Sequence, residues 1–141
     1  MRLRIPNRLE DVFVALEQAA GHLDRHHIDE ACRADVRLVL EELLVNIVRH
    51  GYPDGRDGEI RISIDVHRDH VQLKLEDDAQ PFDARAHELP DLAGDIADRE
   101  IGGLGLHLIH NIADALEYTR HGNRNITVAR FCPTLPDESS P

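Results

Sequence analysis

The sequence has few aromatic residues, few cysteines and too little positive charge to balance its acidic residues. Its 141 residues include no tryptophan, 2 tyrosines and 3 phenylalanines, too few for a platform of rings on which nucleic-acid bases stack. The 16 lysines and arginines are outnumbered by 27 aspartates and glutamates, so the net charge is −11 with neutral histidines. Such a surface repels phosphate backbones and anionic lipid headgroups. We therefore expect no direct contact with nucleic acid and no membrane association.

Long apolar stretches are also absent. No run reaches the roughly 18 residues that a membrane-spanning helix needs, and the N-terminus lacks the apolar stretch of a secretory signal. Cys32 and Cys132 are far apart and outside any CxxC pattern, which is typical of a reducing compartment, so we predict a cytoplasmic protein. The length fits one domain, which we assign to residues 1–132, with a flexible polar tail at 133–141.

Apolar periodicity predicts three helices and five strands. Residues three and four positions apart predict helices over Leu9–Leu23, about Asp29–His50 and about Leu104–Leu116. Short or alternating apolar runs predict strands at 2–5, 60–66, 71–75, 117–120 and 125–131. Residues 79–103 contain Gly, Pro and Asp with weak periodicity and are predicted to form a lid. The order predicts an α/β (α+β) two-layer sandwich, in which helices cover one face of a mixed, mostly antiparallel sheet.

Glu42 and Asn46 form the first candidate functional pair. They are four residues apart on the second helix, so their side chains lie on one face, one turn apart. A carboxylate and an amide so placed can share a cation and position a hydroxyl, and an amide oxygen suits a hard ion such as Mg²⁺. The spacing alone favours a solvated polar face. His50 continues the same line, and we assign it a structural role in capping the last carbonyls of the helix.

Asp77 is the second candidate. It follows the alternation of Val71, Leu73 and Leu75, so the strand directs its carboxylate toward the buried layer. Burial there costs on the order of several kcal/mol unless the carboxylate is paired, and a ligand with an exocyclic amine would satisfy it. The alternative, at even odds, is that the strand has already ended and Asp77 opens an Asx turn.

A glycine-rich run before the third helix is the third candidate. It consists of Gly102, Gly103, Leu104, Gly105 and Leu106. Glycines let the backbone approach a ligand, and a helix N-terminus presents free N–H groups to phosphate. The run fits a hinge for the preceding loop equally well. The ten histidines include the close pairs His107 with His110 and His67 with His70, but neither pair has a metal-site signature, so we predict no transition-metal site.

Together these segments resemble the histidine-kinase-like ATPases. Residues 42–52 (ELLVNIVRHGY) resemble the N box of that superfamily, and their His-Gly-Tyr ending is similar to the anti-sigma-factor serine kinases. Residues 77–83 (DDAQPFD) resemble the G1 box, Asp-x-Gly-x-Pro-Phe-Asp, and residues 102–106 resemble the G2 box. The resemblance covers roughly residues 3–131 with all boxes in order. It implies the histidine-kinase-like (Bergerat) fold, with ATP and Mg²⁺ as cofactors.

The resemblance also implies roles for single residues. Glu42 would be the general base for an acceptor hydroxyl, Asn46 would ligate Mg²⁺ through its side-chain oxygen, and Asp77 would accept the adenine amino group. Thr127 would hold a water beside the adenine. The glycines of the run 102–106 would let the lid close over the phosphates. Ala79 stands where the family has Gly, and if the backbone there required a positive φ, Ala would cost about 1 kcal/mol.

The function that the resemblance implies is an ATP-dependent protein serine/threonine kinase that binds a sigma factor and phosphorylates an anti-sigma antagonist. A sensor histidine kinase needs a phosphoacceptor helix pair and a gyrase-type enzyme needs a transducer domain, and we expect neither within 141 residues. Family members are typically dimers, and here the N-terminal strand and first helix would supply the interface. The alternative is a binding module that sequesters a partner without phosphotransfer, which Ala79 would favour.

Overall fold

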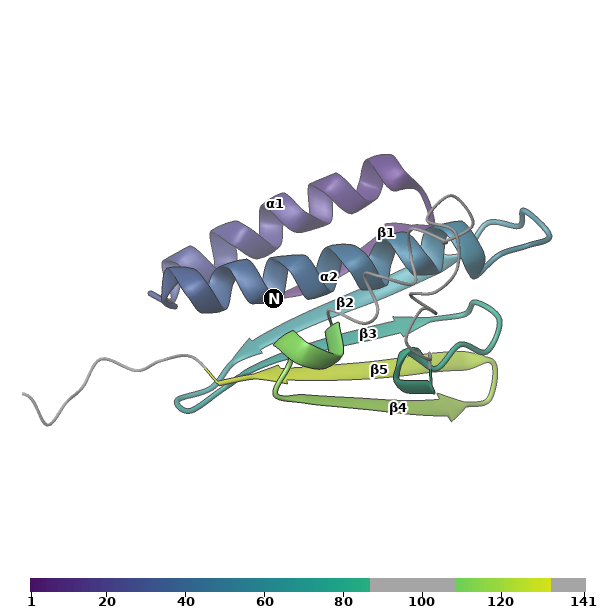
Figure 1. Ribbon diagram of the computed structural model, residues 1–141. Coiled ribbons are helices and arrows are strands. Elements are labelled where there is room, and N and C mark those ends of the chain that lie inside the picture. The colour runs from purple at the N-terminus through teal and green to yellow at the C-terminus, as the bar shows by residue number, and fades with distance from the viewer. Residues whose placement is uncertain (87–108, 133–141) are drawn as a thin grey trace, which may run out of the picture.

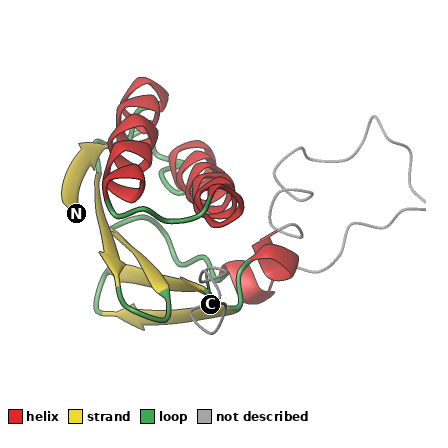
Figure 2. Cartoon of the chain, turned by 90° about the vertical axis from the view of Figure 1, so that its left-hand side faces the viewer, coloured by secondary structure: helices red, strands yellow, loops and turns green. Residues whose placement is uncertain are grey.

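One sheet and two long helices make up most of the described structure. The computed structural model describes residues 1–86 and 109–132. Its elements in chain order are β1 (Arg2–Pro6), α1 (Leu9–Arg25), α2 (Glu30–His50), β2 (Glu59–Val66), β3 (Val71–Asp77), η1 (Ala84–Ala86), β4 (Ala115–His121) and β5 (Arg124–Phe131). The strands form a single sheet in the order β1-β2-β3-β5-β4, with α1 and α2 stacked on one face (Figures 1 and 2). This confirms the two-layer α/β sandwich.

The sheet is held by antiparallel ladders. β1 pairs with β2, β2 with β3, β3 with β5, and β4 with β5, and each of these pairs is antiparallel. We expected a mixed sheet, but the described residues contain no parallel pair. The ladder that matters most for the site joins β3 to β5, because it sets Asp77 opposite Asn125 and Leu75 opposite Thr127.

The apolar core lies between the sheet and the helices. Alternate residues of β2 (Ile60, Ile62, Ile64) and of β3 (Leu73, Leu75) are at most 1% exposed, as the period of two requires for the inward face. They meet the apolar stripes of α1 and α2, whose buried members include Leu16, Leu40 and Leu44. Burying such side chains stabilises the fold by roughly 1.5–3 kcal/mol each relative to exposure.

Helix α2 begins and ends with identifiable contacts. The Asp29 side chain accepts a hydrogen bond from the Cys32 backbone N–H at 3.1 Å and so caps the N-terminus. At the other end Gly51 N donates to Ile47 O at 2.8 Å, with φ at −75°. Glycine is required here by space rather than by conformation, because a Cβ on Gly51 would lie 2.5 Å from Ile47 O and 2.7 Å from the Ala79 Cβ.

Two predicted boundaries were wrong. Helix α1 continues through Gly21 to Arg25. The helix predicted over Leu104–Leu116 covers residues 109–112 in the described part and does not reach Leu116, which belongs to β4. Asp114 N instead donates to Arg130 O at 2.9 Å. The chain therefore pairs with β5 at the positions where the predicted helix would have continued.

Other predictions fall on residues outside the described ranges. Residues 87–108 contain most of the predicted lid and the start of the third helix, and residues 133–141 are the predicted tail. Within the described ranges, no helix combines the length and apolar character needed to cross a membrane.

Candidate functional site

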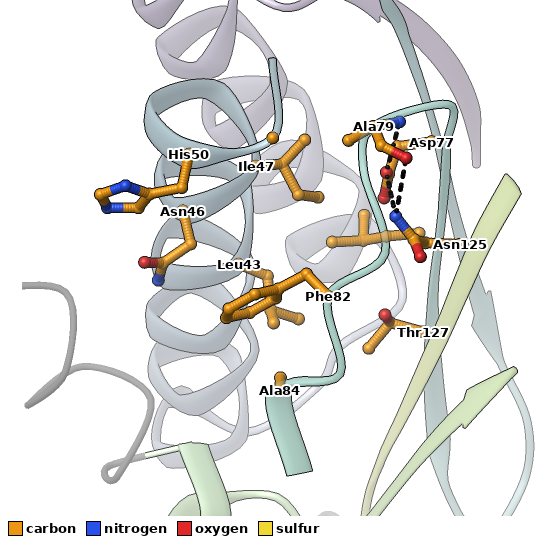
Figure 3. Close-up of a pocket in the computed structure, with 12 residues that line it drawn as sticks. Leu43, Asn46, Ile47, His50, Asp77, Ala79, Phe82, Ala84, Asn125 and Thr127 are labelled. Atoms are coloured by element: carbon orange, nitrogen blue, oxygen red, sulfur yellow. Dashed lines mark hydrogen bonds between the residues drawn. The ribbon is translucent and has the colours of Figure 1, made fainter. Parts of the chain in front are cut away.

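A pocket lies between the C-terminal half of α2 and the ends of β3 and β5. It is lined by Leu43, Asn46, Ile47, His50, Gly51, Leu75, Asp77, Ala79, Phe82, Ala84, Asn125 and Thr127. α2 supplies one wall, the two strands supply the opposite wall, and the segment after β3 supplies a third side, from which the Phe82 ring extends toward the helix (Figure 3). Its walls are mostly apolar, and Asp77 contributes the one carboxylate among the described lining residues.

Asp77 belongs to β3, so the strand has not ended before it, and it also opens the Asx turn of the alternative interpretation. It is the last residue of β3, opposite Ile60, and only 2% exposed, so its side chain does face the helical layer. Its Oδ1 also accepts from Ala79 N at 3.1 Å, which closes an Asx turn. Oδ1 further accepts from the Asn125 amide at 2.9 Å, whereas Oδ2 accepts no hydrogen bond from the described residues.

Burial removes the Asp77 carboxylate from water, so the carboxylate favours a hydrogen-bond donor. Desolvation raises the pKa of Asp77 above its ordinary value, against the hydrogen bonds from Asn125 and Ala79, which lower it. A buried carboxylate with one oxygen unpaired is best satisfied by a donor group from a ligand. Mostly apolar walls with one carboxylate suit a largely apolar ligand that carries an amine.

Asn46 lies across the pocket from Asp77. Its amide nitrogen donates to the Glu42 backbone carbonyl at 2.7 Å. Its Oδ1 has no hydrogen-bond partner among the described residues. An amide oxygen free in this way fits a hard cation such as Mg²⁺, which usually retains waters and needs few protein ligands. The described residues contain no group of three or more His, Cys, Asp and Glu side chains able to hold a metal.

Glu42 lies one turn before Asn46 and is not among the lining residues. It is partly buried, and desolvation is the main cause that raises the pKa of Glu42. Repulsion from Glu41 raises this pKa further, whereas Arg49 lowers it. His50 lines the pocket from the last turn of α2, and its ring makes no hydrogen bond to the described residues, so its structural role at the helix end stays a prediction. The carbonyl of His50 instead accepts from the Gln80 side chain at 2.7 Å.

Ala79 adopts an ordinary backbone conformation. Among the described residues other than glycine, only His27 has a positive φ, so Ala79 carries no left-handed strain. Its methyl group is 3% exposed and faces the α2 terminus, where it occupies the space that a Cβ on Gly51 would need. The free-energy cost that a positive φ would impose on Ala at this position therefore does not arise.

Asn125 is the site residue that the sequence did not reveal. It is 3% exposed, lines the pocket, and donates to Asp77 Oδ1 and to Gln80 O, both at 2.9 Å. A signal was present, since Asn125 has the parity of the buried Thr127, Ala129 and Phe131 in the same strand. Recognising its role required the pairing of β5 with β3, which links residues 48 positions apart.

The remaining predicted residues have different outcomes. Thr127 lies in the pocket wall, 8% exposed, opposite Leu75. The run Gly102, Gly103, Leu104, Gly105 and Leu106 lies outside the described residues, as does His107. His110 contacts the Ala84 carbonyl at 3.0 Å, and His67 and His70 stack with ring centroids 4.4 Å apart.

Comparison with known proteins gives a family match over nearly the whole chain. Residues 5–131 match the family described as histidine kinase-like ATPase domain. The serine-protein kinase RsbW of Listeria monocytogenes serovar 1/2a is 28% identical over 116 residues, which cover 79% of this chain and 74% of that one. The serine-protein kinase RsbW of Bacillus subtilis is 26% identical over 137 residues, covering 93% and 84%.

Solved structures share the fold at lower identity. The structure of the RsbU and RsbW domains of Rv1364c from Mycobacterium tuberculosis matches with a TM-score of 0.65 at 14% identity, covering 96% of this chain and 33% of that chain. The SiaB–SiaC complex from Pseudomonas aeruginosa matches with a TM-score of 0.57 at 16% identity, covering 95% and 89%. These likenesses show that the fold is shared.

Proposed function

Because this chain belongs to the family of histidine kinase-like ATPase domains, we propose that its pocket binds ATP and that it is a protein serine/threonine kinase. The observation that carries the proposal is the Asp77 carboxylate, which lies in a mostly apolar pocket, is 2% exposed and accepts hydrogen bonds from the described residues through Oδ1 alone. The 6-amino group of adenine is the donor that this oxygen would accept, with Thr127 beside it. Relatives named as serine-protein kinases support phosphotransfer to a hydroxyl.

Asn46 is the residue that would hold Mg²⁺, through the oxygen that its hydrogen bond to Glu42 leaves free. Bound there, Mg²⁺ would neutralise charge on the ATP phosphates. Gly102, Gly103 and Gly105, in the run that also contains Leu104 and Leu106, would let the lid close over those phosphates. Phosphotransfer of this kind depends on positioning and charge stabilisation rather than on a covalent intermediate.

Glu42 would orient or deprotonate the acceptor hydroxyl. Its raised pKa supports this role, because a carboxylate whose pKa lies closer to neutrality is a better proton acceptor at the pH of the cell. Its position one helical turn from Asn46 would keep the base beside the cation rather than beside the adenine.

Partner binding is the regulatory half of the proposal. The resemblance to anti-sigma-factor kinases supports a sigma factor as the bound partner and an anti-sigma antagonist as the phosphoacceptor, both in the cytoplasm. The solved SiaB–SiaC complex is an assembly of a protein with this fold and a second protein, which fits such a role. The acidic net charge of −11 argues against direct contact with DNA.

Replacing Glu42 separates a kinase from a binding module that sequesters a partner without phosphotransfer. We expect Glu42→Ala to reduce transfer of γ-phosphate to the antagonist about 10²-fold or more while ATP affinity stays at the wild-type level. Glu17→Ala is the matched control, because it removes an exposed carboxylate within helix α1 that does not act on Glu42. Transfer by Glu42→Ala at the wild-type rate would contradict the assignment of the base. A wild-type protein that binds ATP but transfers no phosphate would favour the binding module.

A further inference from the structure

Asn125 connects three parts of the pocket. It lies opposite Asp77 in the β3–β5 ladder, and its amide nitrogen donates to Asp77 Oδ1 and to Gln80 O, both at 2.9 Å (Figure 3). The same nitrogen lies 3.4 Å from Ala79 O. Because Asn125 is 3% exposed, water does not substitute freely for these contacts.

The orientation of the Asn125 amide follows from the chemistry of its neighbours. Arg120 Nη1, which only donates, lies 3.0 Å from Oδ1, and the Tyr118 hydroxyl donates to the same oxygen at 2.5 Å. On the other side the carbonyls of Ala79 and Gln80 only accept. If the amide were flipped, its NH₂ group would face the Arg120 guanidinium and its oxygen would face the carbonyls of Ala79 and Gln80. The NH₂ group is therefore fixed toward Asp77.

This fixed amide determines how Asp77 is presented. Oδ1 accepts two hydrogen bonds, from the Asn125 amide and from the Ala79 backbone N–H, and these occupy both of its lone pairs. Oδ2 accepts no hydrogen bond from the described residues, so it would be the oxygen that accepts a donor from a ligand in the pocket. Donors on Oδ1 also favour the ionised carboxylate, which cannot donate a hydrogen bond.

We propose that Asn125 is a positioning residue that makes the pocket selective for purines with a 6-amino group over purines with a 6-oxo group. The inference rests on the proposed ATP site. Adenine offers a 6-amino donor to the Asp77 carboxylate, whereas hypoxanthine offers a 6-oxo acceptor that the carboxylate repels. A protonated Asp77 would accept either base, and the Asn125 amide opposes that protonation. Rejection of an acceptor by an acceptor is a strong source of discrimination.

The test compares ATP with ITP, which carries a 6-oxo purine on the same triphosphate. Dissociation constants of both Mg²⁺ complexes are measured by calorimetry for the wild type and for Asn125→Asp. This substitution keeps an oxygen toward Tyr118 and Arg120 but replaces the NH₂ group with a second carboxylate oxygen, so the two acids share a proton. We expect the wild type to bind ATP at least about tenfold more tightly than ITP, and Asn125→Asp to reduce that ratio about tenfold.

Asn123→Asp is the matched control, because it makes the same change two residues away in the exposed β4–β5 turn, and it is expected to keep the wild-type ratio. If circular dichroism shows that Asn125→Asp does not fold, Asn125→Ala replaces it and is expected to lower the ratio about fivefold. If a folded Asn125 variant keeps the wild-type ratio of ATP affinity to ITP affinity, the inference is overturned, even where both affinities are weaker. The proposed ATP site would not be contradicted by that result. A wild type that binds neither nucleotide overturns the proposed function and this inference with it.

Discussion

The Asp77 carboxylate lowers the stability of the fold at neutral pH, where the proposed function would use it to bind a ligand. It is 2% exposed, and burial raises its pKa from the ordinary value of 3.8. The protonated form therefore stabilises the fold, and this contribution is lost as the pH rises through the raised pKa. At neutral pH the ionised side chain is retained at a cost, which is typical of a functional group.

We predict that Asp77→Asn raises the unfolding temperature at pH 7 by about 2–4 °C, corresponding to roughly 1 kcal/mol. The asparagine oxygen can still accept from Ala79 N and Asn125, and no charge remains buried. Thermal unfolding of both proteins across the pH range tests this, since the difference should shrink toward the ordinary Asp pKa of 3.8, where the wild type also becomes neutral. A lower unfolding temperature for Asp77→Asn at pH 7 would show that the carboxylate is needed for the fold.

The end of helix α2 packs closely against the segment after β3, beside the pocket. Gly51 N donates to Ile47 O, Gln80 N donates to Gly51 O at 3.0 Å, and the Ala79 methyl group lies against the glycine. Close approach of α2 to the segment after β3 therefore depends on a residue without a side chain at position 51.

We predict opposite effects for two glycine-to-alanine substitutions. Gly51→Ala should destabilise the fold by about 1–3 kcal/mol, because its Cβ would meet a backbone oxygen at 2.5 Å and the Ala79 Cβ at 2.7 Å. Gly21→Ala, within α1 and with Arg25 Nη1 at 3.8 Å as its nearest neighbour, should stabilise by about 0.5–1 kcal/mol. Urea unfolding measures both free energies. Equal effects of the two substitutions would contradict the contact at the α2 terminus.

The helices and strands differ in how far the sequence predicts them. The alternation of β3 carried through to Asp77 and so predicted the side on which its carboxylate lies. The apolar positions Ile109, Ile112 and Leu116 suggested a longer third helix, because a sequence pattern does not include the β5 ladder that begins at Ala115. Asn125 could not be assigned a role without the strand pairing, since its partners Asp77 and Gln80 are distant in the chain.

At the scale of the whole molecule, α1 and β1 bring together an exposed apolar surface and an unpaired sheet edge among the described residues. Three apolar side chains of α1 are well exposed: Leu9 (41%), Phe13 (62%) and Val14 (50%). β1 is an edge strand, so one side of its backbone is not paired within the described sheet. These features support the dimer that the family resemblance implies.

We predict that light scattering at micromolar concentration gives a mass of twice 15.9 kDa. Phe13→Asp should yield the monomer mass with an unchanged unfolding temperature at matched low concentration, because an exposed side chain contributes little to the fold of one protomer. A wild-type mass near 15.9 kDa would contradict the dimer.

Calorimetric titration of the protein with ATP, with and without Mg²⁺ and beside Asp77→Asn, is the decisive measurement for an ATP site built around Asp77. We expect binding that Mg²⁺ strengthens and that Asp77→Asn weakens by about tenfold or more, because a buried hydrogen bond to a charged group is lost. No binding of wild-type protein at millimolar ATP, or equal affinity of the two proteins, would contradict it.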